Sequence, residues 1–147
     1  MKKSVSIILA TLVLATASVA LYGQATSPEK LASGTYVVYA VSPQVWRVTV
    51  DSKTMANATV GGRFAITAGT PKDIEVLVMT EAEMAKFRDD ATRATAKPIY
   101  TSGRKTEGDV SVKLADSGNY YLVFSNMFAY EGTKTLTTDF KLTFDKK

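Results

Sequence analysis

Short runs of β-branched and aromatic residues, bounded by turn-forming residues, fill most of the chain from residue 34 onward. The clearest run covers residues 136–144, in which Leu, Thr, Phe, Leu and Phe alternate with Thr, Asp, Lys and Thr. Strict alternation is typical of a strand that has one face on a core and the other in water. The pattern therefore predicts antiparallel β-structure.

Further strands are predicted along the chain, separated by clusters of Gly, Pro, Asp, Asn and Ser. They cover residues 35–41, 45–50, 56–60, 63–67, 74–79, 99–101, 110–114 and 120–124. The runs 74–79 and 120–124 are apolar on both faces, so we expect them in the centre of a sheet. Gly61-Gly62 predicts a tight hairpin or a bulge. About seven to eight strands at this spacing predict an all-β, antiparallel β-sandwich of the jelly-roll kind.

One short helix is expected near residues 81–90. Thr80 and Glu83 have the spacing of a capping box, in which the first side chain caps the helix and the second reaches back to it. One apolar stripe follows at helical spacing: Met84, Phe87 and Ala91. This helix is the single departure from β-structure that the sequence predicts.

The first residues have the pattern of a targeting segment. The basic pair Lys2-Lys3 precedes residues 4–20, which are uncharged and rich in apolar side chains. Small residues at cleavage spacing favour a cut after Ala25, with a cut after Ala20 as an alternative. We therefore expect export to the periplasm or the medium, with no stable membrane span after cleavage. The alternative is an uncleaved anchor, because the run approaches the length that spans a bilayer.

A cut after Ala25 defines the expected domain organisation: a signal peptide over 1–25, a flexible lead-in over 26–33 and one β-sandwich domain over 34–147. The cut removes two lysines, so the formal net charge of +4 falls by two. The remaining basic residues are dispersed, with loose groups at Arg88 and Arg93 and at Arg104-Lys105. They are not interleaved with exposed aromatics, and we expect no nucleic-acid partner.

The 147-residue chain contains no His and no Cys. This composition excludes a His general base, a Cys nucleophile, a Cys/His zinc site and any disulfide. An enzyme would have to work with carboxylates, Tyr, Lys or Ser, and no spacing groups them. We therefore predict a non-catalytic protein without cofactor or metal. Calcium bound by scattered loop carboxylates such as Asp109 or Asp116 remains the alternative.

Four large side chains are candidates for partner contact. Met127, Phe128 and Tyr130 follow the strand 120–124 in a predicted loop, where exposed apolar groups would form a contact patch for a protein or an amphipathic ligand. The alternative is that they cap one end of the core. Trp46 is either a core residue or, in a carbohydrate-binding sandwich, a stacking platform for sugar rings.

The segment Gly-Asn-Tyr-Tyr-Leu-Val-Phe-Ser-Asn at residues 118–126, followed by Lys134 and the alternating last strand, resembles the end of the Golgi-dynamics (GOLD) domain. Residues 62–66 and 73–78 resemble upstream strands of that domain. The resemblance implies a β-sandwich with a binding role. Receptors of that family carry a Cys where this chain has Val123, so the resemblance does not extend to cargo-receptor function.

Overall fold

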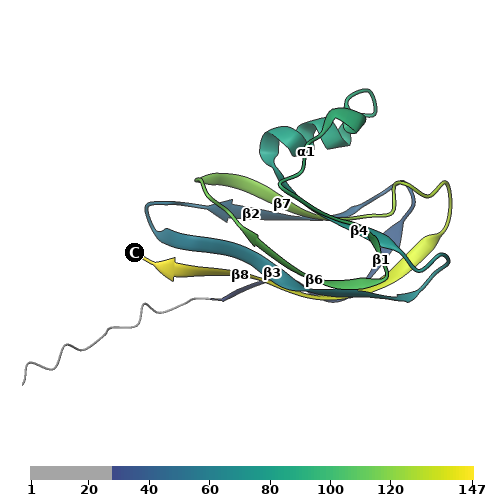
Figure 1. Ribbon diagram of the computed structural model, residues 1–147, viewed down its shortest axis with the longest axis horizontal. Helices are drawn as coiled ribbons and strands as arrows, with labels where there is room; N and C mark the ends of the chain where they lie inside the picture. The colour runs from purple at the N-terminus through teal and green to yellow at the C-terminus, as the bar shows by residue number, and fades with distance from the viewer. Residues whose placement is uncertain (1–27) are drawn as a thin grey trace, which may run out of the picture.

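The computed structural model describes residues 28–147, and the predicted signal peptide lies outside them. Two four-stranded antiparallel sheets form a sandwich (Figure 1), with strand orders β1-β8-β3-β6 and β2-β7-β4-β5. The strands are β1 (Glu29–Tyr39), β2 (Gln44–Val50), β3 (Met55–Ala68), β4 (Ile74–Thr80), β5 (Tyr100–Lys105), β6 (Glu107–Lys113), β7 (Gly118–Ser125) and β8 (Thr133–Lys146). The predicted fold class, with one short helix, is confirmed.

The main core lies between the sheets, where the inward side of each strand meets the other sheet. The predicted alternation of the last strand is confirmed, because Leu136, Phe140 and Leu142 of β8 are buried. Thr138 is buried among them, and its hydroxyl donates a hydrogen bond of 2.9 Å to the carbonyl oxygen of Ala32. A polar side chain at an inward position is thereby satisfied by the neighbouring strand.

Both strands that were predicted to be central are central. β4 lies between β7 and β5, and β7 lies between β2 and β4. Their second apolar face is explained by α1 (Glu81–Arg88), which stands over the outer face of this sheet (Figure 1). A second, smaller core joins this face to the helix: Leu77, Met79, Met84, Phe87, Tyr121 and Val123.

The hairpin or bulge predicted at Gly61-Gly62 is wrong. Both glycines lie inside one continuous strand, β3, which pairs with β8 on one side and β6 on the other. The register shifts of β3 fall elsewhere, between Ala56 and Thr59 and between Ile66 and Ala68. Pairing on both sides holds the glycines in extended backbone, which overrides their turn preference.

The lead-in predicted over residues 26–33 also needs correction. β1 begins at Glu29, so residues 29–33 belong to the first strand. They pair with β8 across a register shift between Lys30 and Ser33, and Ala32 is fully buried. Pairing with β8, rather than the β-propensity of these residues, holds the segment in extended backbone.

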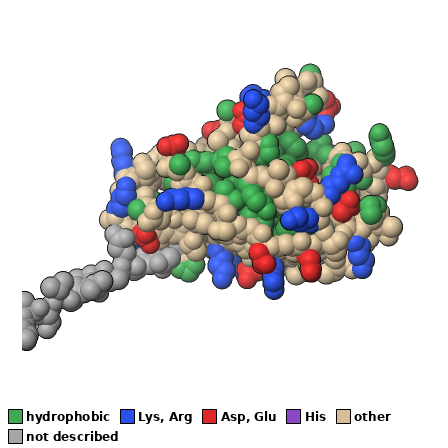
Figure 2. Space-filling view, viewed as in Figure 1, with side chains coloured by type: hydrophobic (Ala, Val, Ile, Leu, Met, Phe, Trp, Pro, Cys, Tyr) green, Lys and Arg blue, Asp and Glu red, His purple; other side chains and the backbone are tan. Residues whose placement is uncertain are grey.

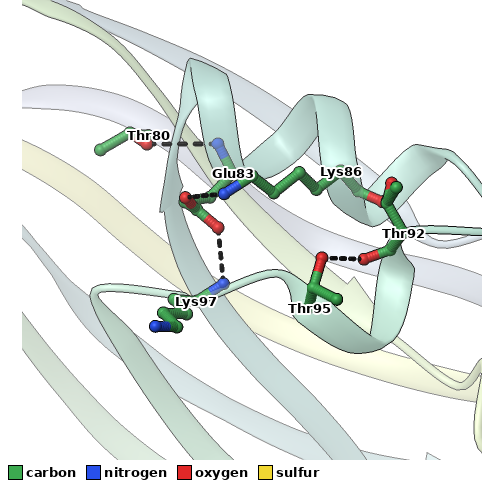
Figure 3. Close-up of polar contacts among 6 residues, drawn as sticks. All are labelled: Thr80, Glu83, Lys86, Thr92, Thr95 and Lys97. Carbon is green, nitrogen blue, oxygen red and sulfur yellow. Dashed lines mark hydrogen bonds and ion pairs between the residues drawn. The ribbon is translucent and has the colours of Figure 1, made fainter.

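The helix begins as predicted, with Thr80 Oγ1 accepting a hydrogen bond of 3.3 Å from the Glu83 amide. The Glu83 carboxylate does not complete a capping box. It accepts instead from Lys86 Nζ at 2.7 Å and from the Lys97 amide at 2.6 Å (Figure 3). Ala91 lies beyond the end of the helix and is exposed, so the predicted stripe reduces to its first two members.

The hydrogen bonds to Glu83 explain how the segment after α1 is held. The bond from Lys86, and after it the bond from the Lys97 amide, keeps the pKa of Glu83 below its ordinary value of 4.5. Between Lys86 and Lys97 the chain forms a single 3-10 turn, Arg93–Thr95, and Thr95 Oγ1 donates to the Thr92 carbonyl at 2.6 Å (Figure 3).

Within residues 28–147, no helix is long and apolar enough to cross a bilayer.

Candidate functional site

Three segments that are distant in sequence meet at one end of the sandwich. They are the β1–β2 connection at 40–43, the β7–β8 connection at 126–132 and the end of α1 with its following loop. The Ala40 amide donates to the Gly132 carbonyl at 3.2 Å and ties the first two together. Figure 1 shows these connections at the right-hand end of the molecule.

Two adjoining hollows of about 370 and 140 Å³ lie between these segments. We call them together the loop-end groove. Both hollows are lined by Val41, Arg93 and Met127. The larger adds Ala40, Asp90, Ala129 and Tyr130, and the smaller adds Pro43, Phe87 and Arg88. Most of the lining residues are apolar in type, but polar atoms make up the greater part of the exposed lining of the larger hollow, and the charged groups lie at the helix side.

Two large apolar side chains of this lining face solvent. Tyr130 is 101% exposed and Val41 is 80% exposed. Hydrophobic side chains are visible at this end in the space-filling view (Figure 2). A single exposed apolar residue is ordinary on a protein surface. Two that flank one hollow make this end of the sandwich a candidate contact site for another molecule.

The three loop residues that the sequence singled out are not equivalent. Met127 is half-buried and packs against the smaller core beneath α1. The half-buried Phe128 ring lies against two cations, with Arg104 Cζ 4.1 Å and Lys134 Nζ 5.0 Å from its centroid. Tyr130 alone of the three is fully open to solvent.

Trp46 lies apart from the loop-end groove. Its half-buried indole packs against the main core and makes edge contacts with Tyr36, at 4.9 Å between centroids, and with Phe124, at 5.4 Å. The contact with Tyr36 links β1 to β2 and so closes one side of the sandwich. Part of the indole surface is therefore taken up by protein rings.

The charged groups of the groove are arranged by α1 and the loop after it. Arg93 is fixed, because Nη2 lies 2.5 Å from Asp90 Oδ1 and Nε donates to the Phe87 carbonyl at 2.8 Å. Arg88 is exposed, with its guanidinium 5.6 Å from the centroid of Tyr121. The sequence grouped these arginines as a loose surface patch, whereas the fold brings them to the rim of the loop-end groove.

Carboxylates do not gather into a metal site in the described part of the chain, where no group of three or more His, Cys, Asp or Glu could hold an ion. Asp109, which the sequence considered for calcium, instead faces Arg63 with Nε and Oδ1 3.2 Å apart. The loop-end groove can contact apolar groups of another molecule through its Val, Met and Tyr side chains, and it can pair a charged group through its arginines.

Sequence reasoning missed a buried ion pair beside the groove. Lys134 is 2% exposed, and its Nζ contacts the Asp73 carboxylate. The sequence did carry a signal for it. The inward positions of β8 are the even-numbered ones, and extending that alternation back from Leu136 reaches Lys134.

Comparison with models of known protein families and with curated proteins finds no match to this chain.

Proposed function

We propose that this protein is a non-catalytic binding module of the cell envelope or the medium that holds apolar side chains of a protein partner in its loop-end groove. One observation carries the proposal: fully exposed Tyr130 and 80% exposed Val41 flank a hollow with Met127 in its lining. Desolvating these groups in a complex would provide the favourable free energy of binding.

The frame of the groove supports this role. The β1–β2 and β7–β8 connections begin and end at strands that are hydrogen-bonded within the sheets. Their ends are therefore fixed before a partner binds, which lowers the entropy cost of binding. Arg88 at the rim is exposed and could pair with a carboxylate of the partner. A protein segment with apolar side chains and a nearby Asp or Glu would match both features.

Two expectations from the sequence agree with this proposal. The signal-like segment over residues 1–25 supports export, and the GOLD-like pattern at residues 118–126 supports a binding rather than a catalytic role. A chain without His or Cys lacks the commonest catalytic side chains. We include in this proposal that the module is GOLD-like.

The experiment that tests the proposal places a photo-crosslinking amino acid at position 130 and exposes the protein to envelope extract of its native host. We expect one predominant adduct, and binding of that purified partner should weaken at least tenfold in the double variant Val41→Ser, Tyr130→Ser. The chain offers a matched control in Val37→Ser, Tyr39→Ser. These residues are also exposed, at 42% and 51%, but do not line the groove. Equal loss in both variants would contradict the proposal.

A second candidate is carbohydrate binding, favoured by the free ring of Tyr130. On a glycan array this function predicts binding that Tyr130→Ser abolishes. If Trp46 were the stacking platform instead, binding would be lost in a folded Trp46→Ala variant. A blank array with a positive crosslink at position 130 would favour the protein partner.

A further inference from the structure

The contact between Lys134 and Asp73 is unusual in both burial and closeness. In the described part of the chain, Lys134 is the one charged side chain that is buried. Its Nζ lies in very close contact with Asp73 Oδ1 and also donates to the backbone carbonyl of Asp73 at 2.5 Å. The amine nitrogen is therefore held on Asp73 by two contacts, one to its carboxylate and one to its backbone carbonyl.

Lys134 lies in a strand of one sheet, and Asp73 lies in the connection that crosses from that sheet to the other. Lys134 is the second residue of β8, and Asp73 directly precedes β4. The side chain of Asp73 is 23% exposed, so its outer part still reaches water. The chain packs closely around the lysine stem, because a Cβ at Gly69 would come within 3.2 Å of Lys134 Cγ. The contact thus ties the start of β8 to the β3–β4 connection.

One aromatic ring and one buried amide lie at this end of the fold. The Phe128 ring covers the contact, with the centroid 5.0 Å from Lys134 Nζ. Asn126, which follows β7 at the same end, is fully buried, and neither polar atom of its amide has a hydrogen-bond partner in the described chain. The buried ammonium loses hydration that its attraction to the partly exposed carboxylate repays only in part.

We propose that Lys134 and Asp73 join in an intramolecular amide bond, formed by the folded protein itself. A proton passes from the ammonium to the carboxylate, and the neutral amine attacks Asp73 Cγ. A bond forms between Nζ and Cγ, one C–O bond of the carboxyl group breaks, and the departing oxygen leaves as water with two protons that came from the nitrogen. The reaction needs no oxidant and no co-reactant.

The fold supplies what this condensation requires. Holding amine and carboxyl in contact replaces a bimolecular encounter by a step within one structure. The product is neutral, so the charge of the buried ammonium is removed. The exposed side of Asp73 gives the released water a way out. The link would tie β8 covalently to the β3–β4 connection in a chain that has no Cys for a disulfide.

The test is the intact mass of the purified, denatured protein. We expect it to lie one water molecule below the mass calculated for the chain from its observed N-terminus, so that removal of a signal peptide is not counted as a link. Trypsin should then fail to cut after Lys134 and should yield a branched peptide in which residues 73–86 are joined to residues 114–141. A protein at the full calculated mass, cut normally after Lys134, would overturn the proposal.

Variants locate the link. Lys134→Arg and Asp73→Ala should each restore the full mass, whereas Asp73→Asn should release ammonia and reach the same final mass as the natural chain. The chain contains an internal control in Lys86 and Glu83, which are in contact at 2.7 Å but whose lysine side chain is 45% exposed, and their peptides should stay unlinked. A loss of mass that maps to Asn126, or to a site without a branch, would overturn the assignment.

Discussion

The ring of Phe140 lies over Gly62, its partner across the β3–β8 ladder. A Cβ built at Gly62 would stand 2.7 Å from Phe140 Cγ and would meet the Asp139 carbonyl still more closely. Phe140 in turn makes an edge contact of 5.4 Å with Phe124 of the opposite sheet. Phe140 can therefore occupy its place in the core only because residue 62 has no side chain.

Replacing Gly62 with Ala should destabilise the protein by about 1–3 kcal/mol, because the new methyl group forces Phe140 and the adjoining backbone to move. The measurement is the midpoint of urea unfolding at an unchanged slope. Gly61→Ala is the neighbouring control. A Cβ there meets only the Val110 carbonyl at 3.5 Å, an ordinary contact. Equal losses from both substitutions would show that the contact with Phe140 does not set the cost, because the change from Gly to Ala by itself restricts the unfolded chain and should not destabilise.

Phe128→Ser and Tyr130→Ser should separate the structural from the exposed residue of the same loop. Phe128 covers the buried end of the Lys134 side chain, so its loss should cost about 1–3 kcal/mol of unfolding free energy. Tyr130 is fully exposed, and its loss should change stability by less than about 0.5 kcal/mol. Thermal unfolding of the two variants at one pH measures the difference. A destabilised Tyr130→Ser variant would show that this ring packs on the fold.

Trp46→Ala should destabilise by about 3 kcal/mol, because the indole fills space between Tyr36 and Phe124 in the core. Near-ultraviolet circular dichroism and denaturant unfolding report the loss. Tyr39→Ala serves as a control for removal of an aromatic from a neighbouring strand, since that ring is 51% exposed. If the Trp46→Ala variant were as stable as the natural chain, the contacts of the indole with Tyr36 and Phe124 would not contribute to stability.

Glu83 should make the segment after α1 sensitive to acid. Its pKa is held below 4.5 by hydrogen bonds from Lys86 and from the Lys97 amide, so the folded state favours the charged form. This stabilisation is present above the unfolded-state pKa and is lost as the pH falls through the lowered value. Amide exchange at Lys97, corrected for intrinsic rates, should therefore quicken in that acid range.

In the variant Glu83→Gln, the Lys97 amide should already exchange fast at neutral pH. Its exchange rate, corrected for intrinsic rates, should then show no further increase as the pH is lowered. Glu131→Gln removes a charge from an exposed loop position and should leave the exchange at Lys97 unchanged. Exchange that stays slow in Glu83→Gln would mean that the loop is held by its 3-10 turn rather than by the carboxylate.

Local patterning was sufficient for most of the fold. Alternation in residues 136–144 predicted the half-buried β8, and two-sided apolar runs predicted the central β4 and β7. Thr80 predicted the start of α1 because a cap acts within a single turn. Each of these signals depends on residues a few positions apart, which is why the sequence already contains them.

Contacts between distant segments were decided by the tertiary structure alone. Gly61-Gly62 has the composition of a turn, yet pairing on both sides makes it strand, and Phe140 gives Gly62 its role. Loop residues Met127, Phe128 and Tyr130 share an apolar character in the sequence, but their neighbours separate them into packed, covering and exposed positions. The groove and the Lys134–Asp73 contact join segments that are distant in the sequence. Packing across the core fixes such pairs, and no local pattern of residues encodes it.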